Sequence, residues 1–173
     1  MKKIFITGLV FATVVLGGCS NKTGLNSSIS KDAYDGSVII TMPEHGNDCS
    51  SMVCTGIGAQ WSSKNPSKAI LLINVFNEIT TIQSAKISID GEEFLIDKKD
   101  GYSNFDSFSP VIRNSKQAFL VDLTLIKSLS KANDARIKVF TSKGQMSDVI
   151  VANGKDSKAI YAIQRFVNDI NNQ

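Results

Sequence analysis

The chain has 173 residues, of which 42% are hydrophobic and 20% charged, and its formal net charge is +3 at pH 7. This length suffices for one domain with its own hydrophobic core. The near balance of charge, without a run of like charges, argues against nucleic acid as a partner, because nucleic-acid binding needs a clustered basic face. It argues equally against an electrostatic membrane-binding patch.

Two lysines, Lys2 and Lys3, follow Met1, and after them comes an almost wholly apolar stretch from Ile4 to Leu16. A membrane-spanning helix needs about 20 apolar residues, which is more than this stretch offers. A short positive segment followed by about 7–15 apolar residues is typical of a secretory signal peptide. The sequence therefore predicts export from the cytoplasm.

The apolar stretch ends in Leu16-Gly17-Gly18-Cys19, which resembles the lipobox of bacterial lipoproteins. That signal consists of an aliphatic residue, two small residues and the cysteine that receives the lipid. The resemblance implies that residues 1–18 are cleaved and that Cys19 carries fatty acids such as palmitate. Two or more acyl chains anchor a protein stably to a membrane. The alternative is an ordinary secreted protein without lipid.

Ser20 follows the cysteine where some lipoproteins have aspartate. In bacteria with two membranes this resembles the signal for the outer membrane, facing the periplasm, so the predicted location is the cell envelope. Residues 19–36 are rich in polar side chains and are predicted to form a flexible tether. Residues 37–173 are then expected to form a single domain.

Segments of the first half of this domain favour β-strands. Apolar runs bounded by turn-forming residues are found at 38–40, 52–61 and 69–76. Two further runs, 86–89 and 94–96, flank Asp90-Gly91, a pair that favours the type I′ turn of a β-hairpin.

The second half combines strands, expected at 117–121, 136–141 and 149–152, with two helices. One helix is predicted over 122–132, with Asp122 as its N-cap, and the other over 156–170, where apolar residues form one stripe. The pattern predicts an α+β fold in which both helices pack on an antiparallel sheet of about six to eight short strands. A β-sandwich with appended helices is the alternative.

Two cysteines remain if Cys19 is lipidated, namely Cys49 and Cys54. An even number in an oxidising compartment predicts a disulfide. Closing a loop of about six residues would stabilise the fold by about 2 kcal/mol. The spacing is not the C-x-x-C of a redox dithiol. The alternative is a copper or zinc site formed by His45, Cys49 and Cys54, since imidazole and thiolate suit these metals.

His45 is the only histidine, so a Ser-His-Asp hydrolase would have to use it. It is expected to lie in an exposed polar loop, and the G-x-S-x-G turn of α/β-hydrolases is absent. Acidic pairs such as Glu92-Glu93 flank a hairpin, where carboxylates are ordinarily solvated. No catalytic residue is predicted, and the protein is expected not to be an enzyme and to need no cofactor.

Three aromatic residues, Tyr102, Phe105 and Phe108, recur at every third position of a polar loop. Such rings offer large contact area at low entropic cost, which makes this loop a candidate contact surface. The competing interpretation is that the rings hold the loop against the core.

These observations predict a membrane-anchored envelope lipoprotein that acts as a non-enzymatic binding or accessory module. Its expected partners are the membrane, through the lipid on Cys19, and an envelope protein or other macromolecule. Two alternatives remain: a lipoprotein that handles copper or zinc through the His45–Cys54 loop, and an inhibitor of an extracytoplasmic enzyme.

The lipid on Cys19 is directly testable. Cells that express the chain and are fed a fatty-acid analogue should incorporate the label into this protein, because the cysteine would be acylated after export. The Cys19→Ser variant should carry no label. An unlabelled wild-type protein would rule out the lipoprotein prediction and favour the secreted alternative.

Overall fold

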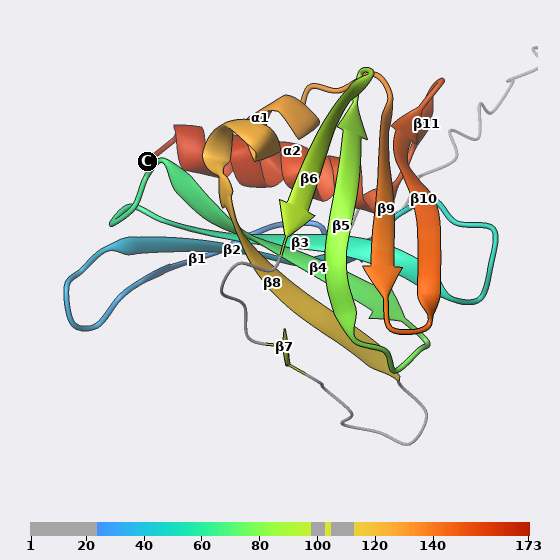
Figure 1. Cartoon of the computed structure of the whole chain (residues 1–173). Coiled ribbons are helices and arrows are strands. Elements are labelled where there is room, and N and C mark those ends of the chain that lie inside the picture. The colour runs from blue at the N-terminus through green and yellow to red at the C-terminus, as the bar shows by residue number, and fades with distance from the viewer. Residues whose placement is uncertain (1–23, 98–102, 105–112) are drawn as a thin grey trace, which may run out of the picture.

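The computed structural model describes residues 24–97, 103–104 and 113–173. Within these ranges the chain forms two antiparallel sheets and two helices, with one helix at the C-terminus (Figure 1). The predicted α+β class with antiparallel strands is therefore confirmed. The strands are more numerous than predicted, and they are divided between two sheets instead of lying in one.

The first sheet has the strand order β1-β2-β3-β4-β8-β7. Its strands are β1 (Ser28–Lys31), β2 (Val38–Gly46), β3 (Cys54–Ser62), β4 (Lys68–Phe76), β8 (Asn114–Asp122) and β7 (Ser103–Asn104). The second sheet has the order β11-β10-β9-β5-β6. Its strands are β11 (Lys155–Asp156), β10 (Gly144–Ala152), β9 (Ala135–Thr141), β5 (Ile82–Ile89) and β6 (Glu92–Asp97).

The hairpin between β5 and β6 confirms the turn predicted from Asp90-Gly91. Both residues have positive φ angles, 48° and 93°, as a type I′ turn requires. The turn sets the register, in which Ile89 pairs with Glu92 and Lys86 with Leu95.

The folded region begins earlier than predicted. Residues 28–31, expected to belong to the tether, pair with β2 as strand β1, and Leu25 is buried in the core. Polar side chains dominate this strand, so its composition resembles a linker. Its pairing depends on backbone hydrogen bonds, which composition does not reveal.

Two close backbone approaches explain the glycines of β3. A side chain at Gly56 would lie 2.8 Å from the carbonyl oxygen of His45 and would strike the ring of Phe76. A side chain at Gly58 would lie 2.9 Å from the carbonyl oxygen of Met42. Glycines weaken an isolated strand, but here they permit the bulge of β2 to pack closely against β3.

The C-terminal helix α2 (Lys158–Asn171) lies against the first sheet and buries its predicted apolar stripe (Figure 1). It contacts β2 and β3, and also β10 of the second sheet. The hydroxyl of Ser157 caps its first turn by accepting a hydrogen bond from the backbone N–H of Ile160.

The first helix, α1 (Leu123–Leu129), is shorter than predicted. Asp122 occupies the N-cap position but its side chain makes no cap hydrogen bond. Its carboxylate accepts instead from the ammonium group of Lys68, at 2.7 Å.

A polar cluster of buried Asn47 and Thr55 with half-buried Asp148 joins the two sheets between β3 and β10. One carboxylate oxygen of Asp148 accepts from the backbone N–H of Thr55 at 2.7 Å and from its hydroxyl at 2.6 Å. The side-chain amide of Asn47 donates to the same hydroxyl at 2.9 Å. Beside this cluster, Asp48 and Val149 form an antiparallel bridge.

Loss of the carboxylate of Asp148 should destabilise the fold. Asp148→Ala leaves the N–H and hydroxyl of Thr55 buried without their acceptor, and we expect the free energy of unfolding to fall by about 2–3 kcal/mol. The matched control is Asp122→Ala, which breaks an exposed ion pair and should cost less than about 1 kcal/mol. Urea unfolding measures both values. Equal losses in the two variants would contradict this role for the cluster.

Candidate functional site

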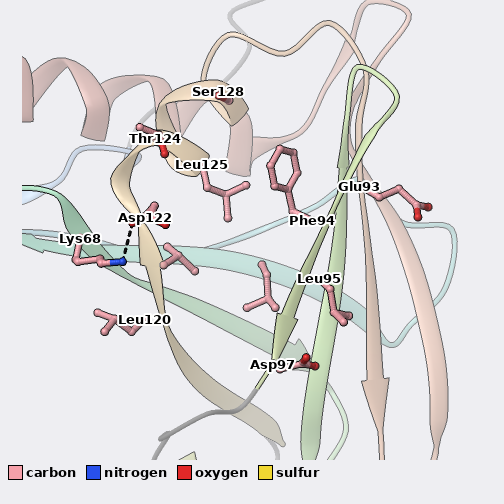
Figure 2. A pocket seen from close by; sticks show the side chains of 12 residues that line it. Lys68, Glu93, Phe94, Leu95, Asp97, Leu120, Asp122, Thr124, Leu125 and Ser128 are labelled. Carbon is pink, nitrogen blue, oxygen red and sulfur yellow. Dashed lines mark hydrogen bonds and ion pairs between the residues drawn. The ribbon is translucent and has the colours of Figure 1, made fainter.

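A groove of about 620 Å³ lies where β6, the end of β8 and helix α1 meet (Figure 2). Among the residues that border it are two exposed leucines, Leu95 and Leu120. Its lining consists of Lys68, Glu93, Phe94, Leu95, Ile96, Asp97, Leu120, Val121, Asp122, Thr124, Leu125 and Ser128.

The groove combines a buried apolar floor with exposed apolar rims. Ile96 and Val121 are buried, and Phe94 and Leu125 pack partly buried against the core. On the rims, Leu95 is 62% exposed and Leu120 is 70% exposed. Figure 2 shows these two leucines on opposite sides of the groove, one from β6 and one from β8. Exposed leucines scattered singly are ordinary. These two border the same groove, which makes it the candidate contact site.

The polar lining is mainly acidic. It contains three carboxylates, those of Glu93, Asp97 and Asp122, and one ammonium group, that of Lys68. Asp122 pairs with Lys68 at 2.7 Å, as the dashed line in Figure 2 marks, and Glu93 pairs with Lys86 at 2.9 Å. Of the described residues that line the groove, none is a histidine or cysteine.

Strand alternation places these side chains. Along β6, Phe94 and Ile96 turn toward the core while Glu93, Leu95 and Asp97 are exposed. The same alternation exposes Leu120 and Asp122 at the end of β8. Sequence reasoning identified both strands but missed the groove, because its walls come from different sheets. The one local signal was Leu95, which lies on the solvent-facing side of the strand together with Glu93 and Asp97.

The predicted disulfide is present, with the Cα atoms of Cys49 and Cys54 5.8 Å apart. Met52, between them, is 86% exposed, and its carbonyl accepts a hydrogen bond from the side-chain amide of Asn77 at 2.7 Å. Neither sulfur is a thiolate in this state, so the metal alternative requires reduced protein. The described residues contain no cluster of three or more histidine, cysteine or acidic side chains suited to a metal ion.

His45 lies in strand β2 and is partly buried, so the prediction of an exposed loop histidine is wrong. A bulge between Met42 and His45 carries the strand past Pro43, which donates no hydrogen bond. The Nε2 atom of His45 is buried and has no hydrogen-bond partner within the described structure. Burial lowers the pKa of His45, and nearby Lys158 lowers it further, while Glu44 opposes them.

Other predicted residues lie outside the described part of the chain, namely Cys19, Tyr102, Phe105 and Phe108. Trp61 is buried in the core, and its indole N–H donates to the carbonyl of Pro66.

Comparison of the chain with family models, with curated proteins and with solved structures finds no match. Among the described residues, no helix is both long and apolar enough to cross a bilayer.

The depressed pKa of His45 makes stability depend on pH. The unfolded chain, with an ordinary histidine pKa of about 6.5, binds a proton more readily than the folded protein does. Stability contributed by His45 is therefore present above pH 6.5 and is lost as the pH falls below it. We expect the thermal midpoint of the wild type to fall more between pH 7.5 and 5.5 than that of His45→Gln. Parallel curves would contradict this assignment.

Proposed function

We propose that this protein is a non-enzymatic binding module of the cell envelope, anchored by lipid on Cys19, that binds another protein through the groove between β6, β8 and α1. The observation that carries the proposal is the pair of exposed leucines, Leu95 and Leu120, at the rims of one groove. Exposed apolar area of this kind is costly in water and is recovered when a partner covers it.

The arrangement of the groove resembles the anatomy of a protein interface. Its centre holds apolar side chains that are already ordered by the core, such as Phe94 and Leu125. Charged groups lie toward its edges, where the Lys68–Asp122 ion pair remains in water. An apolar centre with a polar rim is the usual pattern of protein-binding surfaces, and here the two exposed leucines stand among the charged groups of the rim.

A crosslinking experiment tests the proposal in living cells. A photoreactive phenylalanine in place of Leu120 should crosslink to a defined envelope protein, and the same residue in place of Tyr34 should not. Tyr34 is fully exposed but belongs to the turn between β1 and β2. Leu95→Glu should remove the crosslink from position 120, because it places a charge on the opposite rim.

A narrower alternative is favoured by the exposure of Met52. This residue projects from a loop closed by the Cys49–Cys54 disulfide, as an inhibitor of an extracytoplasmic enzyme would require. The same photoreactive residue placed at position 52 separates the two functions. Crosslinks at 52 that survive Leu95→Glu, with none at 120, would favour the inhibitor and overturn the groove.

A further inference from the structure

We propose that the groove binds an extended segment of a partner protein, which adds as a further antiparallel strand along β6 and carries basic residues alternating with apolar ones. This rests on the proposed function, that the groove binds a protein, and it names the chemistry of the segment. Three features of β6 support it: its place at the end of its sheet among the described strands, the direction of its backbone groups and the charge of its outer face.

Strand β6 is the last strand of its sheet in the described structure. Its pairing with β5 is continuous from Glu92 to Asp97, and the strand contains neither proline nor lysine, two residues that commonly protect an edge. The opposite end of this sheet differs, because β11 has only two residues. The longer, regular edge of β6 is therefore the better template for an added strand.

The turn at Asp90-Gly91 determines which backbone groups of β6 point away from β5. In such a turn the N–H of Glu92 donates to the carbonyl of Ile89, so this pair is hydrogen-bonded. Pairs alternate along an antiparallel ladder, and Phe94 and Ile96 therefore also direct their backbone groups toward β5. The N–H and C=O groups of Glu93, Leu95 and Asp97 point away from β5, and all three residues line the groove.

The side chains beside this edge specify the segment. An added strand would place one face toward the apolar floor, near Phe94 and Leu125, and the other beside Glu93, Leu95 and Asp97. Side chains opposite each other on neighbouring strands stabilise the sheet when their charges are opposite. Apolar residues should therefore occupy the inner face. Lysine or arginine should occupy the outer face, beside Asp97 and beside the carboxylate of Glu93, which already pairs with Lys86 of β5 and has acceptor capacity for a second cation.

The same charges argue against a second copy of this chain as the occupant. Antiparallel pairing of two β6 strands centred on Leu95 would place Glu93 of one copy opposite Asp97 of the other. Like charges directly opposite each other destabilise a sheet. A partner segment with basic residues removes this repulsion.

Peptide binding tests the inference directly. The probe is a fluorescent nine-residue peptide of alternating lysine and valine, and its matched control is the same peptide with glutamate in place of lysine. Both are added to protein purified from cells that express the full chain, and fluorescence anisotropy gives the affinities. The lysine peptide should bind at least about tenfold more tightly. Glu93→Lys combined with Asp97→Lys should reverse the preference. Equal affinity, or no binding by either peptide, would overturn the inference.

Two substitutions of one residue separate backbone pairing from side-chain contact. Leu95→Pro removes an N–H that points away from β5 and keeps an apolar ring, whereas Leu95→Ala keeps the N–H and removes the side chain. Strand addition predicts that the proline variant binds the lysine peptide about tenfold more weakly than the alanine variant. The reverse order would show that the groove binds side chains without adding a strand. Thermal unfolding of both variants verifies that each is folded.

The two proposals fail in different ways. A crosslink at position 120 together with insensitivity to Leu95→Pro would retain the protein-binding function and reject strand addition. Peptide binding that is sensitive to Leu95→Pro, without any crosslink at position 120 in cells, would retain the edge chemistry and reject the proposed function. A second copy as the crosslinked partner would also overturn the inference.

Discussion

The polar cluster that links β3 to β10 constrains how the two sheets of this protein are oriented. The two sheets share no strand, so they are held together by packing in their common core and by polar contacts between them. The carboxylate of Asp148 reaches from the second sheet to both donors of Thr55, within 2.7 Å of each. Because hydrogen bonds need defined distances and angles, only a narrow range of sheet orientations keeps both donors of Thr55 bonded to Asp148.

That attachment also explains where the groove forms. The cluster joins the sheets near β10, while β6 lies at the opposite edge of the second sheet. Helix α2 fills part of the space between, through contacts with β2, β3 and β10. The walls of the groove at the far edge are β6, β8 and the short helix α1. The Cys49–Cys54 disulfide lies beside the cluster, on the segment that links Asn47 to Thr55, so it restrains the same attachment.

Features encoded by neighbouring residues were predictable from the sequence. Asp90-Gly91 predicted its hairpin, the apolar stripe of α2 predicted its buried face, and two cysteines predicted their disulfide. The division into two sheets was not predictable, because each strand pattern is compatible with either sheet. The groove was missed for a related reason: Leu95 and Leu120 are 25 positions apart and belong to strands that do not pair. His45 was misplaced because a bulge past Pro43 leaves no simple signature in the sequence.

The acidic side chains on the outer face of β6 bear both on self-association and on the choice of a partner. An unprotected strand edge invites pairing with any extended chain, including another copy of the same protein. Natural sheets commonly prevent such pairing with lysine or proline on the edge strand. Here a lysine would repel a basic segment, and a proline would remove a backbone N–H donor. Glu93 and Asp97 instead oppose self-pairing by charge while leaving every outward N–H and C=O of the strand in place. The same two carboxylates that disfavour a second copy would favour a basic partner, so protection of the edge and selection of its occupant require no separate devices.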